Sequence, residues 1–397
     1  MNDSGNACVN RRKLRSGAVA LLAAGLALSA QASLDAAKCR IPERFREHPI
    51  FTTRHCGVNF GFLSRRGYFA RPETMAQPEK IRAAGANWVT LNTHFCQETF
   101  ASRRTFLDFD WSAGEIELTE IVKELHRRGL HILLKPCLTN LDSSWMGAVR
   151  FPSKADQQIQ GVTNTYWQTW FGSLRDCLKY YAEFAEKNGV EAMIIGAEYN
   201  GTTGQDDEWL ATIRHVRRYY SGPLTYEFMS SEIREGGLTW LKELDFLSLS
   251  FYPSAAGRDW KERYDRANWP KLAPVPLESM KKMLAERRRD VAEISKRFDN
   301  MPVLFTEIGT RSSRGNVMLP WDALTESVWD GEEQANYMEA VFQTFSDLPC
   351  WMGLSWWKWD ETQKNRTHYS PDPLKDRGFT VYGKPAAAVL RKWCGVK

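Results

Sequence analysis

Two glutamates lie at the ends of apolar runs, where a carboxylate is expected to be buried. Glu198 directly follows the run 192–197, and Glu307 lies near the end of the run 303–308. Burying a carboxylate without a partner is costly, so each is either ion-paired or has an altered ionisation that serves chemistry. Two carboxyl groups about 5–5.5 Å apart can act as acid/base and nucleophile in retaining hydrolysis of a glycosidic bond. Two unrelated structural ion pairs are the alternative.

The elements that must position these glutamates are short apolar runs alternating with amphipathic stretches. Several of the runs show little alternation, which is typical of parallel strands that are covered on both faces. The expected strands are 55–62, 88–93, 131–136, 192–197, 224–228, 246–252, 303–308 and 352–357. Stretches with apolar residues at helical spacing are 115–128, 167–187, 207–219, 277–297, 332–345 and 386–393.

Eight strands, nearly all followed by a helix, predict an α/β fold of the (β/α)₈ barrel type. The active site of such a barrel lies at the carboxyl ends of its strands. Glu198 and Glu307 end the fourth and seventh expected strands, which face each other across the mouth. An open doubly wound sheet is the alternative, but no G-x-G-x-x-G turn supports it.

The distribution of charge excludes a polyanionic partner. The formal net charge is +5, but residues 1–32 hold four basic side chains against one acidic side chain, so the remainder is close to neutral. Such a surface gives no electrostatic attraction for nucleic acid. The chain also has 16 Trp in 397 residues, more than a core needs, so we expect some of them to line a ligand surface.

The first 32 residues have the order of a secretory signal peptide. A basic segment at 11–15 precedes an apolar stretch of 11 residues at 18–28, and Ala-Gln-Ala follows at 30–32. A spanning helix needs about 20 apolar residues, which argues against the alternative of a membrane anchor. We therefore expect a leader at 1–32, an N-terminal extension at 33–53 and a barrel domain at 54–397. The mature protein is expected to be periplasmic or secreted, without membrane association.

Seven cysteines remain after removal of such a leader. Their odd number leaves at least one unpaired thiol, and neither a C-x-x-C pair nor a zinc-like Cys/His cluster is present. We therefore expect no metal. Candidate disulfide pairs are Cys96–Cys137, after adjacent strands, and Cys56–Cys350, near the starts of neighbouring strands. A Cys-dependent hydrolase that uses Cys137 or Cys96 with His94 or His131 is an alternative function, but no nucleophile motif surrounds these cysteines.

An ordered set of motifs resembles glycoside hydrolase family 113 of clan A, a family of β-mannanases. The motifs are LHILLKP at 130–136, WMG at 145–147, IGAEYN at 195–200, FLSLSFYP at 246–253, TEIG at 306–309, WKW at 357–359 and GKPAAAVLRKW at 383–393. The resemblance extends from about residue 55 to the C-terminus. It implies that Glu198 is the general acid/base and that Glu307 is the nucleophile. It implies no cofactor, because the two carboxylates supply all of the chemistry.

The same resemblance suggests substrate-binding residues. Tyr252 matches the clan's tyrosine that hydrogen-bonds the nucleophile, and Trp357 or Trp359 matches the tryptophan beneath the cleaved sugar. A flat indole suits the apolar face of a pyranose. From alternation along the strand we expect only one of these two indoles to point inward. Further candidates for contacts with the sugar or the acid/base are Lys135, Trp145, Asn92, Tyr199 and Asn200, with a structural ion pair as the alternative for Lys135.

Three positions depart from the family pattern. Ala197 stands where many clan A members have Asn before the acid/base, Cys137 stands where the family usually has His, and 228–231 replaces an Asn-Trp pair. These positions line the expected cleft. The resemblance therefore implies hydrolysis of a β-linked polysaccharide, either β-1,4-mannan or a related β-glycan. A non-catalytic carbohydrate-binding or polysaccharide-assembly protein is the alternative, and its marker would be the loss of either glutamate.

Overall fold

The computed structural model describes residues 34, 35, 37–151, 157–159, 162–164, 166–229, 231, 232, 238–359 and 368–394. The leader that the sequence predicts at 1–32 lies outside the described residues, so the folded body is considered alone. No helix among the described residues is both long enough and apolar enough to cross a membrane.

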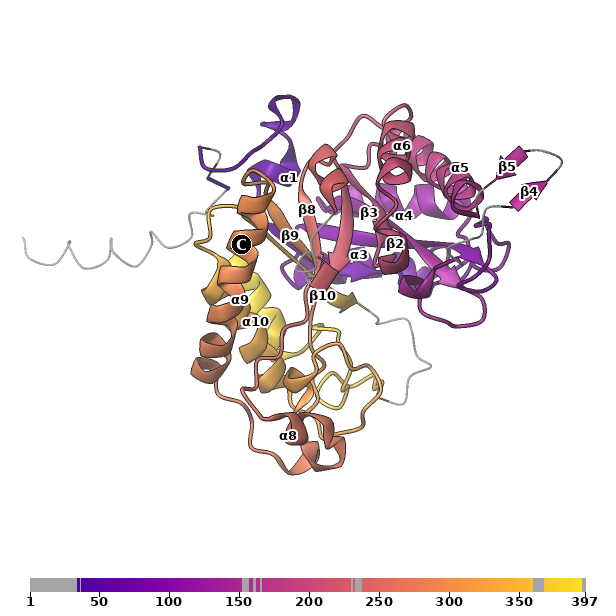
Figure 1. Ribbon diagram of the computed structural model, residues 1–397. Helices are drawn as coiled ribbons and strands as arrows, with labels where there is room; N and C mark the ends of the chain where they lie inside the picture. Colours follow the sequence, from indigo (N-terminus) through magenta and orange to yellow (C-terminus); the bar gives the residue numbers. More distant parts are fainter. Residues whose placement is uncertain are drawn as a thin grey trace, which may run out of the picture. The chain divides into compact units, whose positions relative to one another are not determined.

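Eight parallel strands close into a barrel in the order β1-β10-β9-β8-β7-β6-β3-β2 (Figure 1). This confirms the (β/α)₈ fold predicted from the alternating runs. The strands are β1 (His55–Phe60), β2 (Trp88–Gln97), β3 (His131–Asn140), β6 (Ala192–Ala197), β7 (Leu224–Met229), β8 (Leu247–Ser250), β9 (Val303–Ile308) and β10 (Trp351–Trp359). Two short strands, β4 (Gln157–Ile159) and β5 (Val162–Asn164), form a separate antiparallel pair.

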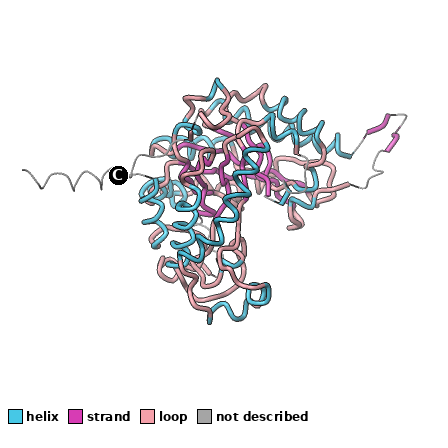
Figure 2. Tube along the Cα trace, turned by 60° about the vertical axis from the view of Figure 1, so that its left-hand side comes forward, coloured by secondary structure: helices cyan, strands magenta, loops and turns pink. Residues whose placement is uncertain are grey.

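Helices surround the strands (Figure 2). They are α1 (Pro49–Thr52), α2 (Pro72–Met75), α3 (Gln77–Ala83), α4 (Glu115–Arg127), α5 (Tyr166–Lys187), α6 (Asp206–Val216), α8 (Trp260–Tyr264), α9 (Leu277–Arg297), α10 (Gly331–Phe345) and α11 (Pro385–Cys394). The six helices expected from helical spacing are thereby confirmed, with ends that differ by a few residues. Short 3₁₀ turns complete the connections. Among them are η3 (Asn200–Thr202), which begins two residues after Glu198, and η4 (Thr239–Glu243), which precedes β8.

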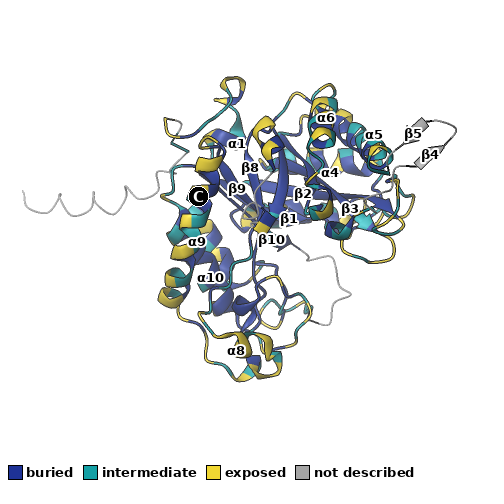
Figure 3. Ribbon diagram, viewed as in Figure 1, coloured by how far each residue is buried: buried dark blue, intermediate teal, exposed yellow. Residues whose placement is uncertain are grey.

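The N-terminal extension closes the bottom of the barrel. Phe45, Ile50 and Phe51 are buried in one apolar cluster with residues from the starts of the strands, such as Trp88 of β2 and Leu304 of β9. A second and larger cluster lies between the strands and the surrounding helices, and Figure 3 shows the barrel strands coloured as buried. The plug at the bottom leaves the carboxyl ends of the strands as the open end of the barrel.

Two disulfide bonds join the ends of the chain to the barrel, and they differ from the expected ones. Cys39 is bonded to Cys350, and Cys56 is bonded to Cys394. The remaining described cysteines are buried thiols: Cys96, Cys137 and Cys177. Both pairs predicted from the sequence, Cys96–Cys137 and Cys56–Cys350, are therefore wrong.

Strand register explains both errors. Cys137 lies opposite His94 rather than opposite Cys96, so the two thiols are offset by two residues along β2 and β3. Cys56 lies opposite Leu354, four residues beyond Cys350. Neither offset can be read from the sequence without the register.

Candidate active site

The end of β6 holds Glu198 in an unusual backbone conformation. Its φ is 57°, in the left-handed region that a non-glycine residue adopts only at a cost of order 1 kcal/mol. Neighbouring groups maintain the conformation: the Glu198 N–H donates to the carbonyl of Glu227 at 2.9 Å, and the Tyr199 N–H donates to the Tyr226 hydroxyl at 2.9 Å. Strain of this kind is typical of sites where a side chain has to be aimed.

The two predicted glutamates face each other at the mouth of the barrel, and a third carboxylate joins them. One carboxylate oxygen from each of Glu198, Glu227 and Glu307 lies within 4.8 Å of the other two. This closeness fits the roughly 5–5.5 Å between carboxyl groups of retaining glycosidases. The expectation that Glu198 and Glu307 approach each other is met by the geometry.

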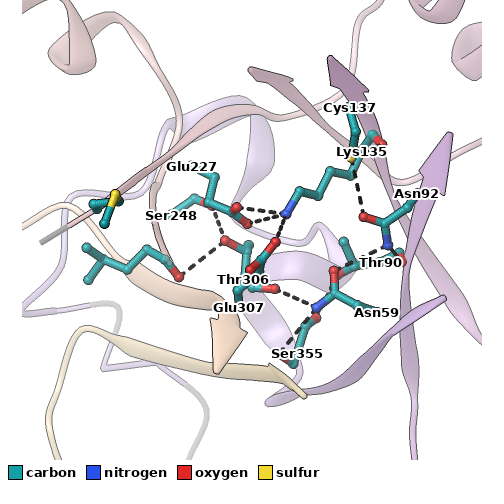
Figure 4. Close-up of polar contacts among 12 residues, drawn as sticks. Asn59, Thr90, Asn92, Lys135, Cys137, Glu227, Ser248, Thr306, Glu307 and Ser355 are labelled. Carbon is teal, nitrogen blue, oxygen red and sulfur yellow. Dashed lines mark hydrogen bonds and ion pairs between the residues drawn. The ribbon is translucent and has the colours of Figure 1, made fainter. Parts of the chain in front are cut away.

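Lys135 supplies the positive charge among these carboxylates (Figure 4). Its ammonium donates to both oxygens of Glu227, at 2.7 and 2.9 Å, and also to Glu307. Burial alone would lower the pKa of Lys135, but the charges of Glu227 and Glu307 outweigh it and raise that pKa above its ordinary value. The three carboxylates could also hold a metal cation, but the Lys135 ammonium already serves as their cation.

Glu227 belongs to this cluster of carboxylates, and sequence reasoning missed it. It lies within the apolar run of β7 and is completely buried. Burial raises the pKa of its carboxyl group, and the Lys135 ammonium opposes that shift. The argument that drew attention to Glu198, a carboxylate in an apolar strand, applies equally to Glu227 and would have found it.

Glu307 is held by two donors. In addition to Lys135, the Tyr252 hydroxyl donates to Glu307 Oε2 at 3.0 Å, as the resemblance implied. Burial, followed by the charge of Glu307, raises the pKa of Tyr252 well above its ordinary value, so the phenol keeps its proton. The carboxylate is thus oriented by an ammonium and a hydroxyl, as suits a nucleophile.

Glu198 has the opposite environment. Burial first, and then the charge of Glu307, raise the pKa of Glu198 above its ordinary value. Hydrogen bonds from Ser250 and Trp145 and the charge of Lys135 lower it in part. Two neighbouring carboxyl groups whose environments differ in this way are suited to separate acid and nucleophile roles.

The carboxylates open into a cavity of about 670 Å³. Among the predicted residues, Trp145, Tyr252 and Trp357 line it together with Glu198 and Glu307. The other lining residues are Met229, Ser231, Ser250, Phe251, Pro253, Ser254, Arg263, Met283, Arg287, Trp321 and Ala323. The indole of Trp145 is 48% exposed and thus available to a ligand.

The tryptophans of β10 are separated as expected, but for another reason. Trp357 lines the cavity, while Trp359 is buried and its Nε1 donates to Gln77 Oε1 at 3.0 Å. Regular alternation puts residues two apart on the same face, so it cannot separate them. A bulge does so, because β10 advances from Trp356 to Trp359 while β1 advances by only two residues.

The remaining predicted residues lie around the cavity rather than in its lining. Asn92 is buried and its amide donates to Asn59 Oδ1 at 3.3 Å, and the Tyr199 hydroxyl accepts from the Leu138 N–H at 3.1 Å. Lys135 is 2% exposed beneath the carboxylates, and Asn200 begins the turn after Tyr199. The described side-chain contacts of the Lys135 ammonium are with the carboxylates of Glu227 and Glu307.

The cysteines are not suited to nucleophilic catalysis. Burial raises the pKa of both Cys96 and Cys137 to about 12, with the charge of Lys135 opposing the shift at Cys137. A reactive cysteine needs a lowered pKa and some access to solvent. The geometry therefore argues against the alternative of a Cys-dependent hydrolase.

The model of Glycoside Hydrolase Family 113 matches residues 58–384. A search of curated proteins gave no significant match.

Solved structures with the same fold include enzymes that act on mannose-containing substrates. A family 113 β-1,4-mannanase is 23% identical, with 87% of this chain and 100% of that chain covered and a TM-score of 0.68. The family 113 β-mannanase AaManA from Alicyclobacillus acidocaldarius is 24% identical, with 88% and 99% covered and a TM-score of 0.70. The family 5 mannosidase of Rhizomucor miehei is 11% identical, with 87% and 93% covered and a TM-score of 0.57. At these identities the structural likeness establishes the fold alone.

Proposed function

The chain belongs to glycoside hydrolase family 113, and from this premise we propose that it cleaves β-1,4-mannan or a related β-glycan with retention of configuration. The observation that carries the proposal is the approach of Glu198 and Glu307, whose carboxylate oxygens lie within 4.8 Å of each other. The β-mannanases among the structures with this fold support the choice of mannan.

In the proposed reaction Glu307 attacks the anomeric carbon while Glu198 gives its proton to the leaving oxygen. The raised pKa of Glu198 keeps that proton available, and Lys135 and Tyr252 keep the Glu307 carboxylate aimed. Water then hydrolyses the glycosyl ester on Glu307, and Glu198 takes the proton of that water. Trp357 offers an indole face to the sugar ring.

The presence and close approach of both glutamates disfavour the alternative of a non-catalytic binding protein, since a barrel that has lost catalysis has no need to keep either carboxylate. The position before Glu198 is Ala197, which has no side-chain donor for the sugar's 2-hydroxyl. We therefore expect other residues that line the cavity to discriminate between mannose and other sugars.

The experiment is time-resolved NMR of β-1,4-mannooligosaccharide hydrolysis, with β-1,4-gluco- and xylo-oligosaccharides as comparison substrates. We expect the β-anomer of the new reducing end to appear first, and mannooligosaccharides to be cleaved fastest. Glu307→Gln prepared in parallel controls for contaminating activity. First appearance of the α-anomer, or failure to cleave any β-glycan, would contradict the proposal.

We also propose that residues 1–32 direct export. Support comes from their basic, apolar and small-residue order. The two disulfide bonds of the folded body add support, since such bonds persist in oxidising compartments. Mass spectrometry of the exported protein should find a mature chain beginning near Ser33, and a chain that retains the leader would contradict the proposal.

A further inference from the structure

The cavity extends beyond the catalytic carboxylates to a wall that carries positive charge. Glu198 and Glu307 are the acidic residues of its described lining, and Arg263 and Arg287 are the basic ones. Arg263 lies on α8 and Arg287 on α9, elements that follow β8 and lie outside the barrel strands (Figure 1). A neutral mannan offers no group that needs two guanidinium ions.

Arg263 has unused hydrogen-bonding capacity. Its Nε is buried and has no acceptor among the residues that the structure describes, and none of them forms an ion pair with its guanidinium. A buried donor without an acceptor is destabilising, so this nitrogen is suited to an acceptor that arrives with a ligand.

Arg287 lines the same cavity and forms an ion pair with Asp290. Its Nη1 donates to Asp290 Oδ2 at 2.6 Å, and its side chain is 37% exposed. The remaining donors of the guanidinium fork are not used by that bond. A planar guanidinium pairs with a carboxylate through two parallel hydrogen bonds, a geometry that an ammonium cannot offer.

An aromatic side chain in the same lining indicates that the anion is carried on a sugar. Trp321 belongs to the connection between β9 and α10 and is 54% exposed. An exposed indole can stack on the apolar face of a pyranose. Indole and guanidinium groups together fit a sugar ring with a carboxylate better than they fit a free inorganic anion.

We propose that Arg263 and Arg287 form a subsite for the carboxylate of a uronic acid unit. The preferred substrate is then an acidic β-linked glycan rather than a neutral mannan. This inference rests on the proposed glycosidase function and narrows its substrate class.

The test compares two substrates of equal length: a neutral β-1,4-mannooligosaccharide, and the same oligosaccharide with mannose units oxidised at C6 to carboxylates. The quantity measured is the ratio of kcat/KM for the acidic substrate to that for the neutral one. We expect a ratio of about ten or more for the parent enzyme, the size of effect that one charge-assisted pair supplies.

Variants locate the effect. Arg263→Ala should lower the ratio about tenfold, and Arg263→Lys should restore part of it, because an ammonium keeps the charge but not the fork. Lys261→Ala is the matched control, since it removes a charge from the same helix but Lys261 does not line this cavity. A parent ratio near one, or equal losses in Arg263→Ala and Lys261→Ala, would overturn the proposal. A C6-sulfated oligosaccharide that is preferred equally would overturn the assignment to a carboxylate.

Calorimetric titration of the same oligosaccharides distinguishes failure of the proposed hydrolytic function from failure of the proposed carboxylate subsite. If neither substrate is cleaved, the hydrolytic proposal fails, but binding still tests the subsite. Tighter binding of the acidic oligosaccharide, with the difference lost in Arg263→Ala and kept in Lys261→Ala, supports the subsite. Equal binding of the two oligosaccharides overturns it.

Discussion

Lys135 donates to both carboxylate oxygens of Glu227, at 2.7 and 2.9 Å, and both side chains are buried. Because the same ammonium also donates to Glu307, Glu227 determines how much positive charge acts on the proposed nucleophile. Glu227 and the proposed nucleophile Glu307 thus share one ammonium.

A double-mutant cycle tests this arrangement. Lys135→Met leaves two carboxylates without their cation and should lower the free energy of unfolding by about 3–5 kcal/mol. Glu227→Gln should cost less, because Glu307 still pairs with the lysine, and the double variant should lose less than the sum. Chemical unfolding followed by tryptophan fluorescence measures all three. Additive losses, within about 0.5 kcal/mol, would show that the pair is not coupled.

The sequence predicts those features of the site that depend on one strand at a time. Glu198 and Glu307 follow or end apolar runs, and the closed barrel necessarily brings such ends together. Disulfide partners could not be predicted, because Cys56 meets Cys394 only when α11 packs against the barrel. The position of Arg263 and Arg287 at the cavity could not be predicted either. Arg263 lies within a long connection and Arg287 follows it, and the periodicity of a sequence does not predict how such connections fold.

The pH dependence of activity should respond to Ser250. Its hydrogen bond lowers the pKa of Glu198, so Ser250→Ala should raise that pKa further. The alkaline limb of the kcat/KM profile follows deprotonation of the general acid and should therefore move to higher pH. Ser254→Ala is the matched control, since Ser254 lines the same cavity without a described hydrogen bond to Glu198. A limb that stays in place in Ser250→Ala, or moves equally in both variants, would contradict the assignment of Glu198 as the acid.

The disulfide pattern can be checked by labelling thiols after denaturation without a reductant. Among the described cysteines, alkylation should reach Cys96, Cys137 and Cys177 but none of the four bonded ones. Joint replacement of Cys56 and Cys394 by Ser should lower the free energy of unfolding by about 2–5 kcal/mol, because the bond closes a very long loop in the unfolded chain. Labelling of Cys56 or Cys394 in the oxidised protein would show that this bond is absent.

The two catalytic roles can be separated by adding azide to alanine variants. Glu307→Ala should lose on the order of 10³-fold or more in turnover, because no other group replaces the covalent attack. Glu198→Ala should be severely impaired on natural substrates but much less on an activated aryl glycoside, whose leaving group departs without a proton.

On that aryl glycoside, azide should restore the rate of Glu198→Ala and give a product of retained β-configuration, since it enters from the side of the missing acid/base. With Glu307→Ala, azide should give the inverted α-product, because it attacks from the side that the nucleophile has left vacant. NMR of the glycosyl azides distinguishes the two outcomes, which a loss of activity alone cannot do. Products of the same configuration from both variants would show that the roles of Glu198 and Glu307 are wrongly assigned.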